Sequence, residues 1–152
     1  MGFTYKQNSN TKLYLPLDGN STDSSGGGNN GTDTAITYSQ ANGRFGQGAG
    51  FDGTSSKIIT GDCNYGTRLS VAVWVKPSNT TQKNFARLIE SNYLTGFSLN
   101  YYSSASPNKI YACIKGVGVY TNGNTPIIPN VWSHFVLTYN GTNLSVYKNG
   151  SL

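Results

Sequence analysis

The sequence is poor in charged residues, in cysteine and in histidine. Charged residues make up 11% of its 152 residues, against about a quarter of an average soluble domain. Two cysteines and a single histidine are too few for a zinc site, which takes about four Cys or His ligands. These counts exclude a Cys/His metal cluster.

The sequence also lacks a long apolar run. Its longest one, LSVAVWV at residues 69–75, is much shorter than the roughly 20 residues of a membrane-spanning helix. The N-terminal MGFTYKQNSN does not place a basic segment before an apolar one, as a secretory signal does. We therefore expect a soluble chain without membrane insertion or an export signal. A chain that stays in a reducing compartment keeps its thiols reduced, which favours free thiols at Cys63 and Cys113, although their number allows one disulfide.

The cations are scattered. Eleven Lys and Arg residues give a net charge of +5, but they stand singly along the chain. Nucleic-acid binding needs clustered cations interleaved with stacking aromatic rings. We therefore expect no nucleic-acid partner.

Short apolar runs separated by glycine, asparagine, serine and threonine fill most of the chain, which is typical of strands joined by turns. Apolar and smaller residues alternate in LSVAVWV, as in a strand with one face on a core. Asn140-Gly141 and Asn149-Gly150 are dipeptides that close β-hairpins. A long loop is predicted at 18–34, and strand-like runs are predicted at KLYLPL (12–17), FGQGAGFDG (45–53), SKIIT (56–60), LSVAVWVKP (69–77), FARLIES (85–91), GFSLNYYS (96–103), NKIYACIKGVGVYTNG (108–123), Val131–Tyr139 and Leu144–Lys148.

These strands and turns recur about every ten residues without an amphipathic helix between them. Such spacing predicts an all-β fold, an antiparallel β-sandwich. We found no linker and no internal repeat, so we expect a single domain over residues 1–152.

Four stretches taken together resemble a known family: LYLPLDGNSTDSSGGGNNGT, GRFGQGAGFDGTSSKIIT, LSVAVWVKP and NVWSHFVLTYNGTNLSVYKNGSL. In this order and spacing they are similar to the LamG-like jelly-roll domains of the concanavalin A-like lectin and glucanase superfamily. The resemblance runs from Leu13 to Leu152 and implies a jelly-roll sandwich. Members of the family continue past the Y-x-N-G turn through further strands. The resemblance therefore implies either a domain truncated at its C-terminus, which we favour, or closing strands supplied by another polypeptide or a neighbouring copy.

Some members of that superfamily hydrolyse glycosides with a facing pair of carboxylates. The paired-glutamate motif of these catalytic relatives is absent here, because Glu90 is the one glutamate of the sequence. We also found no Ser/His/Asp set in a nucleophile-elbow context and no phosphate-binding loop. We therefore expect no enzyme activity. The resemblance implies a packing role for His134, and Asp52 in FDG is expected to hold a turn through its carboxylate.

Calcium is the cofactor with some support. Asp18, Asn20 and Asp23 stand close together in an oxygen-rich loop, which suits a hard cation, and related domains often hold a structural calcium near this loop. The alternative is a polar loop without metal.

Sugar binding is the activity that the resemblance implies. It requires exposed aromatic rings and hydrogen-bonding side chains near them. The candidates lie in or beside predicted loops, and cross-strand packing is the alternative role of the same aromatic residues: Tyr93, Tyr101, Tyr102, Tyr120, Asn92 and Asn100.

Two functional hypotheses follow. In the first, the chain is a non-catalytic, lectin-like module that binds glycans and is displayed on a cell or particle surface. In the second, it is a structural or interaction β-sandwich of a virus particle, such as a decoration or tail-fibre domain, with a neighbouring protein surface as its partner and no sugar ligand. We favour the first.

Overall fold

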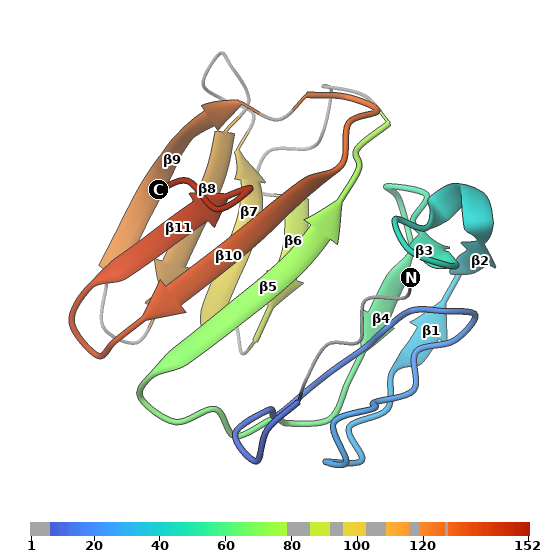
Figure 1. Ribbon diagram of the computed structural model, residues 1–152, viewed down its shortest axis with the longest axis horizontal. Coiled ribbons are helices and arrows are strands. Elements are labelled where there is room, and N and C mark those ends of the chain that lie inside the picture. Colours follow the sequence, from blue (N-terminus) through green and yellow to red (C-terminus); the bar gives the residue numbers. More distant parts are fainter. Residues whose placement is uncertain (1–6, 79–85, 92–95, 103–108, 116–118, 127) are drawn as a thin grey trace. The chain divides into compact units, whose positions relative to one another are not determined.

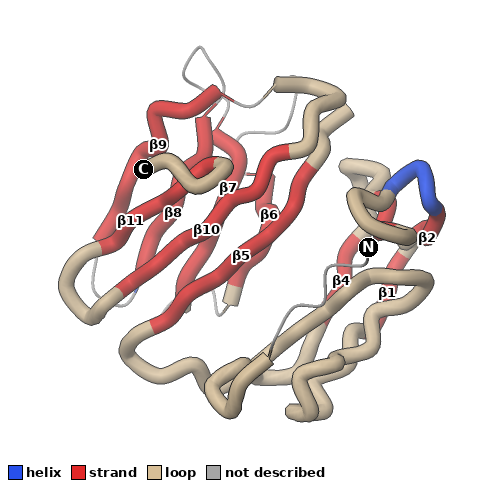
Figure 2. Tube along the Cα trace, viewed as in Figure 1, coloured by secondary structure: helices blue, strands red, loops and turns tan. Residues whose placement is uncertain are grey.

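The computed structural model describes residues 7–78, 86–91, 96–102, 109–115, 119–126 and 128–152. The chain forms two compact units, Met1–Tyr65 and Gly66–Leu152, which are described separately here. Nearly all regular structure is β-strand, as Figures 1 and 2 show. The prediction of one domain over residues 1–152 stays a prediction. In the described part of the chain, no helix has the length and apolar character that crossing a membrane requires.

The first unit has four short strands and one turn of 3-10 helix. Its strands β1 (Thr32–Thr34) and β4 (Lys57–Ile59) pair antiparallel, and so do β2 (Thr37–Ser39) and β3 (Gly48–Gly50). The 3-10 turn η1 (Gln40–Asn42) follows β2 directly, and the Ser39 side chain caps it by accepting a hydrogen bond from the Asn42 amide. The short extended pieces predicted at 45–53 and 56–60 are thus confirmed as β3 and β4.

The strand predicted at 12–17 is wrong. Residues 11–17 form no strand, and Leu17 has a φ of 59°, a left-handed conformation that strands do not contain. The Tyr14 amide donates to Asp23 Oδ1 and the Tyr14 carbonyl accepts from the Ser24 amide. The backbone groups that a strand would offer to a neighbour therefore bind the following loop.

The second unit contains both sheets of the sandwich. The three-stranded sheet has the order β11 (Leu144–Lys148), β10 (Ser133–Tyr139), β5 (Leu69–Val75). The four-stranded sheet has the order β6 (Ala86–Glu90), β7 (Phe97–Tyr102), β8 (Lys109–Ile114), β9 (Val119–Pro126). All neighbouring strands are antiparallel, so the predicted all-β sandwich is confirmed. The run at 108–123 divides into two strands, β8 and β9, which the alternation alone did not predict.

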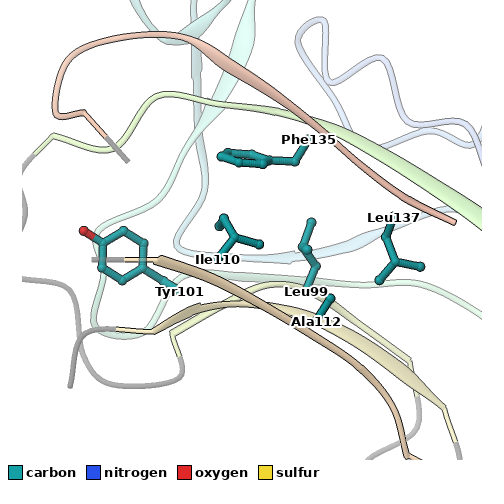
Figure 3. Close-up of a cluster of buried hydrophobic side chains, with 6 residues drawn as sticks. All are labelled: Leu99, Tyr101, Ile110, Ala112, Phe135 and Leu137. Carbon is teal, nitrogen blue, oxygen red and sulfur yellow. The ribbon is translucent and has the colours of Figure 1, made fainter. Parts of the chain in front are cut away.

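The core lies between these two sheets. Phe135 and Leu137 of β10 are fully buried, together with Leu99 of β7 and Ile110 of β8. Figure 3 shows the β10 side chains pointing toward those of the four-stranded sheet. Side chains on alternate positions of a strand share one face, which explains why a period of two in the sequence produced one continuous apolar layer. Burying each large side chain contributes about 1.5–3 kcal/mol.

The turn after β11 has the predicted conformation. Asn149 and Gly150 have φ values of 51° and 86°, as a type I′ turn requires. The chain then returns to pair at a single bridge, between Ser151 and Lys148.

Candidate functional site

The outward surface of the three-stranded sheet carries a group of aromatic side chains. Trp74 of β5 and His134 of β10 are paired across the two strands. Their rings are stacked with centroids 4.8 Å apart and an interplanar angle of 28°. Trp74 is 41% exposed, a high value for the largest side chain in proteins. The stack therefore presents an aromatic surface to solvent.

A second aromatic side chain lies beside this stack. Trp132 and Lys76 occupy the positions two residues away from His134 and Trp74, which places them on the same side of their strands. The Lys76 Nζ lies 5.3 Å from the centroid of the Trp132 ring, a cation–π contact. We call Trp74, Lys76, Trp132 and His134 the aromatic face.

The backbone fixes the position of this face. The His134 amide donates to Asn149 Oδ1 at 2.9 Å, and the His134 carbonyl accepts from the Asn149 amide at 2.8 Å. The Asn149-Gly150 turn thereby holds the end of β10 on which His134 lies. The packing role that the resemblance implied for His134 agrees with its stack on Trp74.

The outward surface of the four-stranded sheet is different, because its polar side chains are buried. Asn100 Nδ2 donates to Ser98 Oγ at 3.0 Å, and Ser98 Oγ lies 3.0 Å from Cys113 Sγ. Ser98 and Asn100 are 0% and 6% exposed. Glu90 closes one end of this network through ion pairs with Arg87 and Lys115.

The predicted sugar-binding residues are dispersed. Tyr101 points into the core and is 2% exposed, and Asn100 belongs to the buried network. The backbone of Tyr102 pairs with Lys109, and that of Tyr120 with Cys113. Asn92 and Tyr93 lie outside the described residues. Cross-strand packing describes Tyr101 in this structure, and a sugar-binding role for the set stays a prediction.

The predicted calcium ligands each hold a different backbone amide. Asp18 Oδ1 accepts from the Gln47 amide and Asn20 Oδ1 from the Thr22 amide. Asp23 Oδ1 accepts from the amides of Tyr14 and Ser25, and its Oδ2 accepts from the Asn29 amide. Burial raises the pKa of Asp23, but the hydrogen bonds from Ser25, Tyr14 and Asn29 outweigh it and lower the pKa to about 2.

Among the residues that the structure describes, no three His, Cys, Asp or Glu side chains lie close enough together to hold a metal ion. Asparagine and backbone oxygens also bind calcium, so calcium at this loop stays a prediction.

Asp52 has the predicted turn role. Its Oδ1 accepts from the amides of Thr54, Ser55 and Ser56 at 2.7–2.9 Å. The hydrogen bonds from Ser56, Thr54 and Ser55 hold the pKa of this carboxyl well below its usual range.

Both cysteines are free thiols, as predicted. Cys113 is buried in the network with Ser98, and burial raises the pKa of the Cys63 thiol.

Sequence reasoning did not find Trp74 as a candidate. The alternation in LSVAVWV places Trp74 on the side of β5 opposite the core valines. That signal was available, since a tryptophan on the solvent side of a strand leaves a large ring uncovered.

With the fold and the two sheet surfaces described, the class of the protein follows from a family model. The model for the concanavalin A-like lectin/glucanases superfamily matches residues 49–152. The chain belongs to this superfamily.

One solved structure extends the comparison. The chain is similar to domain 4 of AbnA, a GH43 extracellular arabinanase from Geobacillus stearothermophilus, solved in complex with arabinotriose. The two share 20% sequence identity with a TM-score of 0.64, over 92% of this chain and 71% of that one. At this identity the likeness shows the fold. No characterised protein matched the sequence in a separate search.

Proposed function

We propose that this chain is a non-catalytic, lectin-like carbohydrate-binding module, displayed on a cell or particle surface, and that the aromatic face binds the sugar. The observation on which this rests is the exposed Trp74–His134 stack. Membership of a superfamily that includes lectins supports the proposal, as does the similar domain solved with arabinotriose.

The chemistry of the face suits a sugar ring. The C–H groups of a pyranose or furanose form an apolar patch that packs on an aromatic ring, and tryptophan offers the largest such surface. The ammonium group of Lys76 lies within the same face and can donate hydrogen bonds to sugar hydroxyls. Because the rings are held by paired strands, little side-chain entropy is lost on binding.

The absence of catalysis is part of the proposal. Glu90 is held between Arg87 and Lys115, and the carboxylate of Asp52 is used by three amides of its own turn. Carboxylates in such structural roles support a binding function over hydrolysis, which needs two carboxyl groups facing the scissile bond.

A glycan array that includes arabinotriose tests the proposal, with the array-selected sugar then titrated in solution. Trp74 and Trp132 are the two tryptophans of the sequence, so sugar binding should change the intrinsic fluorescence. We expect Trp74→Ala to weaken binding by at least tenfold, since loss of an aromatic stacking partner costs about 1–3 kcal/mol.

Phe45→Ala is the matched control. Phe45 is an exposed aromatic residue of the first unit, at 55% exposure, and its removal should leave sugar affinity unchanged. Equal affinities of the Trp74→Ala and wild-type chains would overturn this site. A folded chain that binds no glycan on the array would overturn the sugar-binding function and favour the structural β-sandwich.

A further inference from the structure

The two sheets of the second unit end in four edge strands, and three of these have features that block the addition of another strand. The pairing of β6 is shifted between Arg87 and Ile89, beside the ion pairs of Glu90. The pairing of β9 with β8 is also shifted, and β9 ends at Pro126. At the end of β11, Lys148 and Ser151 exchange backbone hydrogen bonds of 2.8 and 3.0 Å. Bulges, charges, proline and turns of this kind prevent edge-to-edge pairing.

The fourth edge strand, β5, has none of these features. Its register with β10 is unbroken from Leu69, opposite Tyr139, to Val75, opposite Ser133. The strand LSVAVWV contains neither proline nor a charged residue. Among the described strands β10 is its one hydrogen-bonded neighbour. The other edge of β5 therefore offers a regular row of backbone N–H and C=O groups.

The apolar core is also incomplete at β5. Phe135 and Leu137 of β10 are 0% exposed, whereas their partners on β5, Val73 and Val71, are only partly buried. At the opposite side of the sandwich, β11 contacts both β8 and β9 of the facing sheet, whereas the extensive contacts of β5 within the described residues are with β10. Figure 1 shows β5 and β11 at opposite edges of the three-stranded sheet.

From these observations we infer that the β5 edge is a docking site for an extended segment of a different polypeptide, which adds to the three-stranded sheet as its fourth strand. The segment needs apolar side chains at alternate positions, because one of its faces completes the layer of Val71, Val73 and Val75. The backbone hydrogen bonds supply affinity, and the apolar side chains supply register.

Charge defines the ends of this segment. Arg68 and Lys76, both exposed, stand directly before and after β5. Opposite charges on directly facing strand positions are stabilising, and like charges are destabilising. The docked segment therefore carries an acidic residue at each end. A second copy of β5, paired antiparallel about its central Ala72, would place Arg68 opposite Lys76 and is disfavoured.

A designed peptide tests this inference on the full chain. The probe is a fluorescein-labelled peptide of alternating Thr and Val with Glu at both ends, and its binding is followed by fluorescence anisotropy. We expect saturable binding, weakened roughly three- to tenfold when the two Glu residues are replaced by Lys. The Arg68→Glu/Lys76→Glu double variant should reverse that preference. Arg68→Glu alone, which leaves the contact between Lys76 and Trp132 intact, should reduce it.

Two further peptides separate strand addition from hydrophobic adhesion. One is N-methylated on all its valines and the other on all its threonines, so that each loses the N–H groups of one edge. Strand addition requires that at least one of them bind more than tenfold more weakly. Equal binding of all three peptides, or no binding of any to a chain shown to be folded, would overturn the inference. Sedimentation showing a dimer that excludes the peptide would replace it with self-association at β5. Sugar affinity measured on the same samples is independent, because it reports on the opposite side of the Trp74 ring plane from the strand edge only through the aromatic face and not through the backbone.

Discussion

At the scale of single residues, most polar side chains of the loops act on the backbone beside them. Asp52 is the clearest case, since one of its oxygens accepts from three successive amides. Its role was predictable because aspartate before glycine commonly organises a turn. The aromatic face was less predictable. Strand alternation indicates the side on which Trp74 lies, but it does not tell whether another segment covers that side.

The lowered pKa of Asp52 predicts a pH-dependent stability. A carboxyl whose pKa is lower in the folded chain stabilises the fold above the ordinary aspartate pKa of about 3.9. That contribution is lost as the pH falls toward the folded-state pKa. The difference in urea midpoint between the wild-type chain and Asp52→Asn should therefore be larger at pH 6 than at pH 3. Asp62→Asn, at an exposed position, serves as the control, and a difference that is equal at both pH values would contradict this role.

At the scale of elements, period-two alternation predicted the strands of the sandwich well. It predicted β5, β6, β7 and β11 closely because each has one face on a shared core. It was wrong at 12–17, where Tyr14 binds the loop around Asp23 instead of a strand. Alternation measures which residues prefer burial, but it does not reveal whether a pairing partner exists.

The alternation of β10 predicts sharply different costs for adjacent residues. Phe135 is fully buried and Val136 lies on the outward side of the same strand. Phe135→Ala should lower the free energy of unfolding by about 3–5 kcal/mol. Val136→Ala should lower it by less than about 1.5 kcal/mol, as measured by urea denaturation. Similar losses for the two variants would place the core on the wrong face of the sheet.

Calcium binding by the loop at 18–23 is a prediction at the same scale. A carboxylate oxygen that accepts one hydrogen bond retains a second lone pair, so Asp18 and Asp23 can hold their amides and a cation together. We expect millimolar calcium to raise the thermal midpoint of the wild-type chain relative to EDTA, and to raise that of Asp18→Asn less. Identical calorimetric midpoints in calcium and EDTA would show that the loop needs no metal.

At the scale of the whole molecule, the sequence alone predicted the fold class but neither the strand order nor the two compact units. Strand order depends on pairings between distant segments, such as β5 with β10, and local patterns contain no record of them. The same limitation hid the aromatic face, since Trp74 and His134 meet only after that pairing forms.

The central claim is that this superfamily member binds sugar through Trp74 and its neighbours. The most direct test is an NMR titration of the ¹⁵N-labelled chain with arabinotriose and with the array-selected sugar, observing the indole N–H signals of Trp74 and Trp132. We predict that these signals and the backbone amide of His134 shift saturably, while the signals of the 18–23 loop do not. Saturable shifts elsewhere in the chain, with both indole signals unmoved, would contradict the account.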